Sequence, residues 1–160
     1  MDRRILAVAA VAVSGLLLEA CGSTSPSTPV APPTTNGTVS GTVAMGPVSG
    51  AAVAAFAVAN GTMGAQVGGG TADSTGNFTI SIGTYAGPLM VQASGGTYTD
   101  VATGTAMAMQ PGDVMACAIP SVAGGVATTG IQITPLTTMA HSRAHHMTGG
   151  ISSARITAAN

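Results

Sequence analysis

Hydrophobic and polar residues divide the chain into three parts. A basic start is followed by an apolar run from 5 to 18, and residues 22–36 then hold four prolines and almost nothing to bury. From Gly37 onward, short apolar or alternating runs are separated by glycine-rich turns. The pattern predicts a leader at 1–20, an extended tether at 21–36 and a folded domain that begins at residue 37.

Five segments of the folded part have the pattern of β-strands. They are short, rich in Val, Ile, Thr and Ala, and bounded by turn-forming residues. The segments are 38–43, 51–59, 62–67, 78–82 and 89–93. A less regular section at 97–108 leaves room for a further strand. The domain is therefore predicted to be all-β.

The turns between these segments carry their own signals. Asn60-Gly61 favours a two-residue hairpin turn. The run Gly68–Gly70 is interpreted as flexible spacing that ends the returning strand, with no lysine to help it bind phosphate. Asp73 is expected to cap its own backbone in a tight turn rather than to bind calcium. The strand after this turn has the clearest alternation in the chain, and its expected inward residues are Phe78, Ile80 and Ile82.

Three phrases in this part carry a family resemblance. They are Gly41-Thr42-Val43, then Gly46-Pro47-Val48-Ser49-Gly50-Ala51-Ala52-Val53, then Thr71-x-Asp73-x-x-Gly76-x-Phe78. In this order they resemble the carboxypeptidase regulatory-like domain, a small transthyretin-like β-sandwich. The resemblance implies a Greek-key sandwich of about seven strands, which serves as a folding, packing or binding module without a catalytic site. We therefore expect a β-sandwich domain at 37–134.

The leader has the layout of a secretory signal. Its apolar run is shorter than the roughly 20 residues that a helix needs to cross a bilayer. The residues Leu18-Glu19-Ala20-Cys21 resemble the lipobox of bacterial lipoproteins, in which the cysteine receives a diacylglyceryl group and becomes the new N-terminus. The resemblance implies lipid attachment at Cys21, and Gly22 in place of Asp implies the outer membrane or the cell surface. The alternative is a secreted carbohydrate- or peptide-binding module without a lipid anchor.

A second phrase marks the end of the β-domain. Residues 131–140 read Ile-Gln-Ile-Thr-Pro-Leu-Thr-Thr-Met-Ala, similar to a phrase that introduces a helical region in bacterial surface lipoproteins. Pro135 suits the first turn of a helix. We therefore expect a short helical tail at 135–160, with helices over 140–147 and 151–160. The chain stops where the second helix opens, as in a truncated reading frame, so the apolar side of this tail is expected to lack a partner and to be poorly ordered.

Charge is scarce, and this scarcity argues against most enzymes. Charged residues make up 6% of the chain, against a usual share of about 25%. After the leader the formal charges are Asp73, Asp100, Asp113, Arg143 and Arg155. General acid–base catalysis and phosphate binding need more such groups, so we expect no catalytic residue and no cofactor. A net charge of −1 gives no basic patch for nucleic acid. The expected partners are the membrane and an envelope protein or a glycan.

The histidines form the one cluster of residues that commonly bind metals. In a helix, His141 and His145 would lie one turn apart, a spacing that suits a transition metal. His146 and Arg143 lie beside them, but no Glu, Asp or Cys is near in sequence to complete the coordination. We therefore expect a solvated helix face and no metal site.

Cysteine, tyrosine and methionine give weaker signals. Acylation of Cys21 would leave Cys117 without an intrachain partner, and Cys117 is expected to be a small buried hydrophobe. Tyr85 and Tyr98 are the aromatics that a binding module would use, although core packing is the safer interpretation. The methionines that we expect as core filler rather than copper ligands are Met107, Met109 and Met115.

Overall fold

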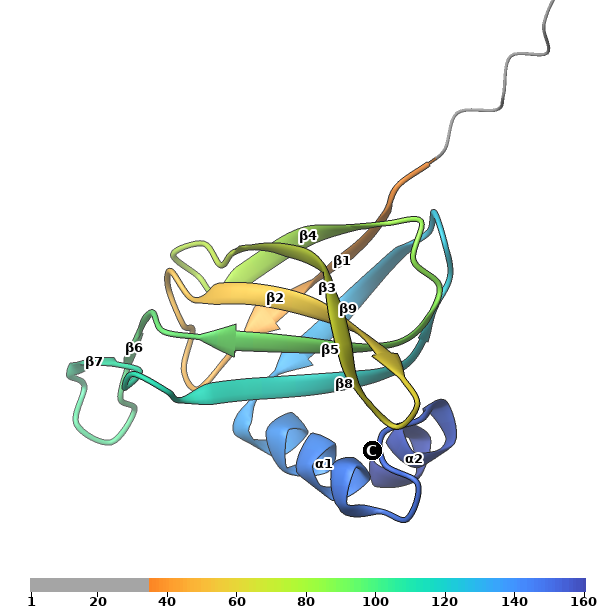
Figure 1. Cartoon of the computed structure of the whole chain (residues 1–160). Coiled ribbons are helices and arrows are strands. Elements are labelled where there is room, and N and C mark those ends of the chain that lie inside the picture. The colour runs from red at the N-terminus through yellow and green to blue at the C-terminus, as the bar shows by residue number, and fades with distance from the viewer. Residues whose placement is uncertain (1–34) are drawn as a thin grey trace, which may run out of the picture. The chain divides into compact units, whose positions relative to one another are not determined.

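The structure is a computed structural model that describes residues 35–160. The predicted leader and Cys21 lie outside these residues. The elements are β1 Gly37–Val43, β2 Ala52–Ala59, β3 Thr62–Thr71, β4 Asn77–Gly83, β5 Gly87–Ser94, β6 Thr97–Thr99, β7 Ala106–Ala108, β8 Val114–Val122, β9 Ala127–Ile133, α1 Pro135–His146 and α2 Ser153–Ala159 (Figure 1). The all-β prediction for the domain is confirmed.

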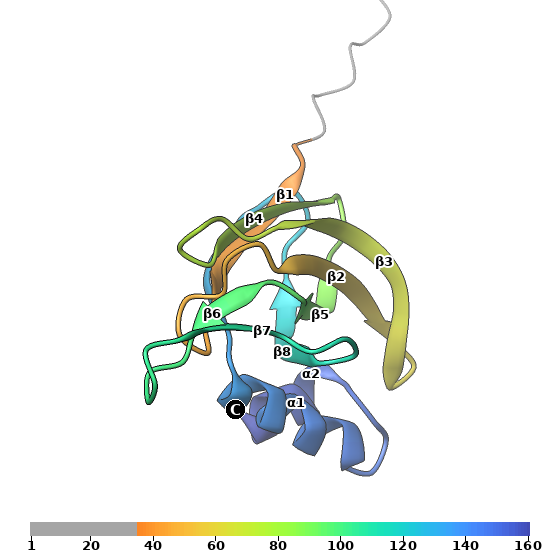
Figure 2. The same ribbon diagram turned by 90° about the vertical axis from the view of Figure 1, so that its left-hand side faces the viewer.

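The strands form two larger sheets and one hairpin. The three-stranded sheet has the order β4-β1-β9, and the four-stranded sheet has the order β3-β2-β5-β8. All pairs are antiparallel except β1 and β9, which run parallel. The section 97–108 forms the separate hairpin β6-β7, which projects from one end of the sheets (Figures 1 and 2).

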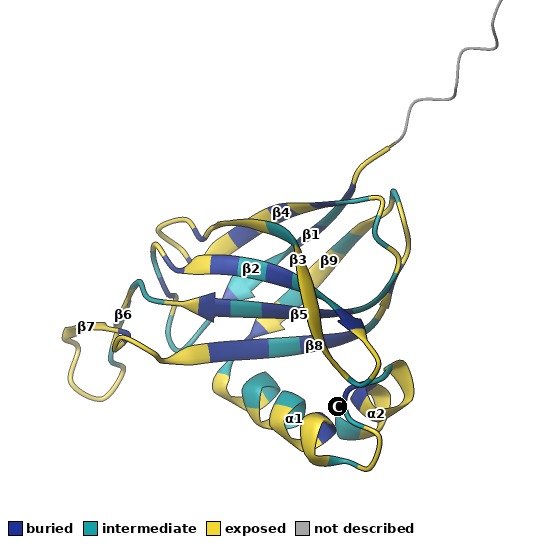
Figure 3. Cartoon of the chain, viewed as in Figure 1, coloured by how far each residue is buried: buried dark blue, intermediate teal, exposed yellow. Residues whose placement is uncertain are grey.

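The main core lies between the two larger sheets. Alternate residues of each strand point into it, so buried and exposed positions alternate along β4 (Figure 3). The predicted inward residues Phe78, Ile80 and Ile82 are 3%, 2% and 2% exposed, which confirms that prediction. From the four-stranded sheet, Leu89 and Val91 meet them in the same core. The two sheets therefore pack face to face.

The glycine run is part of a strand, so its interpretation as flexible spacing is wrong. β3 continues through Gly68–Gly70, and Gly68 pairs with Ala55. A Cβ atom at Gly68 would lie 2.2 Å from the backbone oxygen of Ser81 in β4, and one at Gly70 would lie 3.0 Å from Ile80 Cγ2. Glycine thus lets β3 pass close to the other sheet.

The turn before β4 is built as the sequence predicted. Asp73 Oδ1 accepts hydrogen bonds from the Thr75 amide at 2.8 Å, the Thr75 hydroxyl at 2.7 Å and the Asn77 amide at 2.9 Å. Gly76 has φ +82°, a conformation that favours glycine. The hydrogen bond from the Thr75 hydroxyl, followed by those from the Thr75 and Asn77 amides, lowers the pKa of Asp73.

Replacing Asp73 with Ala is expected to lower the melting temperature at pH 7. Because the folded-state pKa is lowered, the stabilisation by the carboxylate is present above the unfolded pKa and is lost as pH falls through the folded one. The difference in melting temperature between parent and Asp73→Ala should therefore shrink as the pH falls below about 4. Asp73→Asn, which keeps an acceptor without the charge, is the control. A difference that stays constant down to pH 2 would contradict this role.

The C-terminal helix α1 starts where the sequence predicted a helix start. Thr134 caps it, with its Oγ1 accepting from the Thr137 amide at 3.2 Å while the Thr137 hydroxyl accepts from the Thr134 amide at 2.9 Å. Pro135 stands in the first turn. The helix ends at His146, one residue before the expected end at 147. The second helix, α2, begins at Ser153, two residues after the expected start at 151. No helix among residues 35–160 is long and apolar enough to cross a membrane.

The two helices cover one end of the outer face of the four-stranded sheet. The expectation that the apolar side of the helical tail lacks a partner is therefore wrong. Figures 1 and 2 show α1 and α2 side by side beneath the sheets. A second core joins both helices and the loop between them to β2, β5 and β8, and its members are Val58, Met90, Ala118, Ala144, Ile151 and Ile156. The Ile151 amide also donates to the Gly61 oxygen at 2.8 Å.

Candidate functional site

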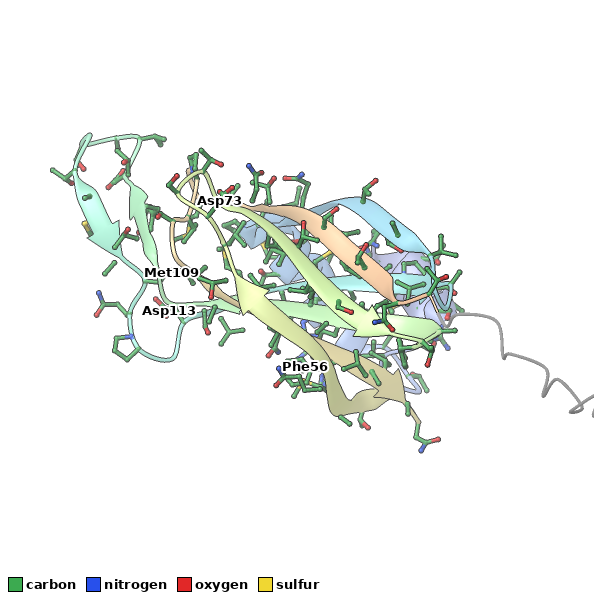
Figure 4. The ribbon with its side chains drawn as sticks, turned by 90° about the horizontal axis from the view of Figure 1, so that it is seen from above. Phe56, Asp73, Met109 and Asp113 are labelled. Atoms are coloured by element: carbon green, nitrogen blue, oxygen red, sulfur yellow. The ribbon has the colours of Figure 1, made fainter. Side chains whose placement is uncertain are left out.

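The helices leave the other end of this outer face open. A hollow of about 620 Å³ lies there, which we name the outer groove. The residues of the outer groove used below are Ala54, Phe56, Gln66, Gly69, Gln92 and Ser94. Figure 4 shows Phe56 well apart from Asp73, Met109 and Asp113, which lie toward the hairpin end of the domain.

The register of the four strands explains the hollow. One row across the sheet runs Gly69, Ala54, Gln92, and the next runs Gln66, Phe56, Met90. Residues directly opposite one another in antiparallel strands share a face. The first row is low at Gly69 and Ala54, because glycine and alanine carry little or no side chain. The larger side chains around this low floor are Gln92 at the end of the same row and Phe56 and Gln66 in the next.

The outer groove is polar but uncharged. Gln66 Nε2 donates to the Gly68 oxygen at 3.2 Å, and its Oε1 accepts no hydrogen bond among the described residues. The side chains of Gln92 and Ser94 likewise make no hydrogen bond within residues 35–160. Phe56 is half-buried. The arrangement offers an aromatic ring, amide donors and amide acceptors to a ligand, and its lining contains no acid, base or charged group.

Sequence reasoning missed these residues. The continuous apolar run 51–59 predicts a strand, but it does not indicate which face of the sheet carries Phe56. Val53 and Ala55 of the same strand point into the main core. Because successive side chains of a strand point to opposite faces, Phe56 points to the outer face. Gln66 and Gln92 give no signal in the sequence, because only the pairing of β2 with β3 and β5 places them beside Phe56.

The two candidate tyrosines lie elsewhere. The Tyr85 hydroxyl donates to the Pro88 oxygen and accepts from the Val58 amide at 3.3 Å, so Tyr85 fastens the start of β5 to β2. Tyr98 packs against the main core beside Ser49 and Thr97. Core packing is therefore the role of both.

The methionines divide between core and surface. Met109 and Met115 are buried, as expected of core filler, whereas Met107 is 43% exposed in β7, so that expectation is wrong for Met107. Met45 joins the buried pair and Asp113 around a hollow of about 270 Å³. Met109 and Asp113 are labelled in Figure 4. Asp113 Oδ2 accepts from the Gln110 amide at 3.1 Å and so closes its own turn.

His141 and His145 lie one turn apart on α1, as predicted. His141 is half-buried, so the expectation of a solvated helix face is wrong for His141. The ring centroids of His141 and His145 are 6.4 Å apart, and those of His145 and His146 are 5.4 Å apart, while Arg143 is exposed. Burial lowers the pKa of His141, and the charge of His145 lowers it further. His141 Nε2 is buried without a hydrogen-bond partner among the described residues. Within residues 35–160, no group of three or more His, Cys, Asp or Glu side chains is placed to hold a metal ion.

Cys117 packs as a small hydrophobe, as predicted, but it is half-buried and not fully buried. It lies in β8 and packs against the main core. Burial raises the pKa of its thiol, so the thiol stays protonated at neutral pH. Cys21 lies outside the residues that the structure describes.

Comparisons with known proteins give a distant likeness to a solved structure. Neither a family model nor a curated protein matches this chain. Among solved structures, the chain is similar to a 9R-lipoxygenase from Cyanothece PCC8801, with a TM-score of 0.36 and 13% identity. The similarity covers 62% of this chain and 16% of the lipoxygenase chain.

Proposed function

We propose that the protein is a non-catalytic lipoprotein of the bacterial cell envelope, anchored through Cys21 and presenting a ligand-binding β-domain. The observation that carries this proposal is the sequence Leu18-Glu19-Ala20-Cys21, which is followed directly by the Pro-, Ser- and Thr-rich tether. Two or three acyl chains hold a protein durably at a membrane. The tether, at about 3.1 Å per residue, gives the domain reach from that surface. The outer membrane or the cell surface is the proposed location.

The finer fold assignment is part of this proposal. We assign the domain to the transthyretin-like Greek-key sandwiches, of which the carboxypeptidase regulatory-like domain is one. Two of the resembling phrases occupy turns that join the sheets, since Gly46 and Gly50 have φ +79° and +72° before β2, and Gly76 closes the turn before β4. Such a sandwich serves to display loops and sheet faces.

The positions of the acidic residues support a non-catalytic role. Each of the three carboxylates after the leader accepts a hydrogen bond from a nearby backbone amide within its own turn. Asp100 Oδ1 accepts from the Ala102 amide at 2.8 Å, in the same manner as Asp73 and Asp113. Carboxylates used in this way shape loops and are not paired with one another for acid–base chemistry.

Replacing Cys21 with Ser is expected to abolish acylation and membrane association in a bacterial host. The parent chain should give an intact mass for residues 21–160 plus acyl chains and should sediment with membranes, whereas Cys21→Ser should not. Cys117→Ser is the matched control and should keep both properties, because Cys117 lies in the folded domain. A parent chain recovered soluble and without acyl chains would instead support the secreted module.

A further inference from the structure

We propose that the outer groove binds an uncharged oligosaccharide, with Phe56 as the stacking surface and Gln66 and Gln92 as the hydrogen-bonding groups. This assignment names the ligand class of the proposed binding module. It rests on the proposed function only for the location at the cell envelope where the protein would encounter the sugar. The groove itself is formed entirely by the β-domain.

The side chains around the hollow match the chemistry of a sugar. A pyranose ring has an apolar face of C–H groups, which suits the electron-rich face of an aromatic ring. Its hydroxyls both donate and accept hydrogen bonds, as does a glutamine amide. Phe56 lies beside Gln66 in one row, and Gln92 lies diagonally from Phe56 in the next. Stacking and hydrogen bonding are thus available to a single ligand.

The lack of charge in the lining of the outer groove favours neutral polar ligands over charged ones. That lining contains no charged side chain. An acidic sugar, a phosphate or a charged peptide would lose water there without gaining an opposite charge, and burying an unpaired charge is unfavourable. A neutral polyol loses hydrogen bonds to water that the amides and the Ser94 hydroxyl can replace.

The backbone under the hollow argues against a peptide added as a strand. The lining comes mainly from β2 and β3, with Gln92 and Ser94 from β5. β2 and β5 are paired on each side within the sheet, and β3 is its edge strand. The amides and carbonyls of β2 and β5 are therefore used in the sheet. Strand addition needs a free edge, which only β3 offers among these three strands, and a strand added there would lie beside the sheet and not over the face that holds the hollow. A ligand in the outer groove must be recognised by side chains, as sugars are. The volume of about 620 Å³ falls within the range of roughly 300–1,000 Å³ for ligand sites.

The experiment measures binding of three neutral hexasaccharides, namely maltohexaose, cellohexaose and chitohexaose, by calorimetry. The full chain is used in two forms, the membrane-extracted parent in detergent and the exported Cys21→Ser variant. At least one hexasaccharide should bind with a dissociation constant between about 10 µM and 1 mM. In ¹⁵N spectra, the side-chain amide signals of Gln66 and Gln92 should shift on addition of that sugar.

Two kinds of variant test the site itself. Phe56→Ala and Gln92→Ala should each weaken binding at least about fivefold, because each removes one mode of recognition. Ala54→Leu should also weaken it, because the larger side chain fills the floor. The matched control is Gln132→Ala, an exposed glutamine of β9 in the other sheet, which should change affinity less than about twofold.

Several outcomes would overturn the proposal. They are no binding of any of the three sugars, binding that Phe56→Ala and Gln92→Ala leave unchanged while their thermal unfolding shows them folded, and selection of peptides or acidic glycans by the same residues. Acylation is scored separately by intact mass, so loss of the lipid anchor would not be mistaken for failure of the groove. Sugar binding by a parent chain that carries no acyl chains would support the proposed ligand and contradict the proposed lipid anchor.

Discussion

Replacing Gly41 with Ala is expected to destabilise the domain severely, by about 3 kcal/mol or more. Gly41 lies in β1, the middle strand of the three-stranded sheet, opposite Ile131 of the parallel strand β9. A Cβ atom at Gly41 would lie 1.8 Å from the backbone oxygen of Ile131 and 2.6 Å from its carbonyl carbon. Because these atoms are backbone, no side chain can rotate to make room. The two strands must separate, and pairing between them is lost.

The matched control for this prediction is Gly69→Ala. A Cβ atom there would meet Gln66 Nε2 at 2.9 Å, the far end of a flexible side chain that can move away. Thermal unfolding should show a melting temperature lowered by about 10 °C or more for Gly41→Ala, and by only a few degrees for Gly69→Ala. Similar melting temperatures for the two variants would show that β1 and β9 do not approach as closely as described.

Local features of the fold could be predicted because their causes are local. The Asn60-Gly61 turn joins β2 to β3 as expected, with φ of 52° and 78° at the two residues. Thr134 and Pro135 begin α1 for the same kind of reason, since a cap and a first-turn proline act within one turn of helix. Such signals need no knowledge of the rest of the chain.

Features that join distant segments could not be predicted. Nothing near Gly41 indicates that a strand about 90 residues later runs parallel to it and needs the space of its missing side chain. The glycines of β3 were misinterpreted for a similar reason, because β4 alone shows why side chains are excluded there. The helices gave a weak signal because Ala144, which is fully buried, is too small to mark an apolar face.

The outer groove is also a feature that joins distant segments of the chain. Phe56, Gln66 and Gln92 are separated in sequence and meet only through the pairing of three strands. Whether Phe56 contributes to the core or remains available at the surface can be tested by comparing its effect on stability with that of Phe78, the other phenylalanine of the chain. Phe78 is 3% exposed in the main core, whereas Phe56 is half-buried at the groove.

Phe78→Ala is expected to destabilise the domain by about 3–5 kcal/mol, because it leaves a cavity between the two sheets. Phe56→Ala should lower stability by about 1.5 kcal/mol or less, because its ring is partly exposed to solvent already. Urea unfolding of both variants beside the parent measures the two free energies. A small loss for Phe56→Ala would mean that this aromatic ring is available for binding and that the variant tests sugar recognition without unfolding the sheet. Equal losses would make Phe56 a core residue and would leave the outer groove without its stacking surface.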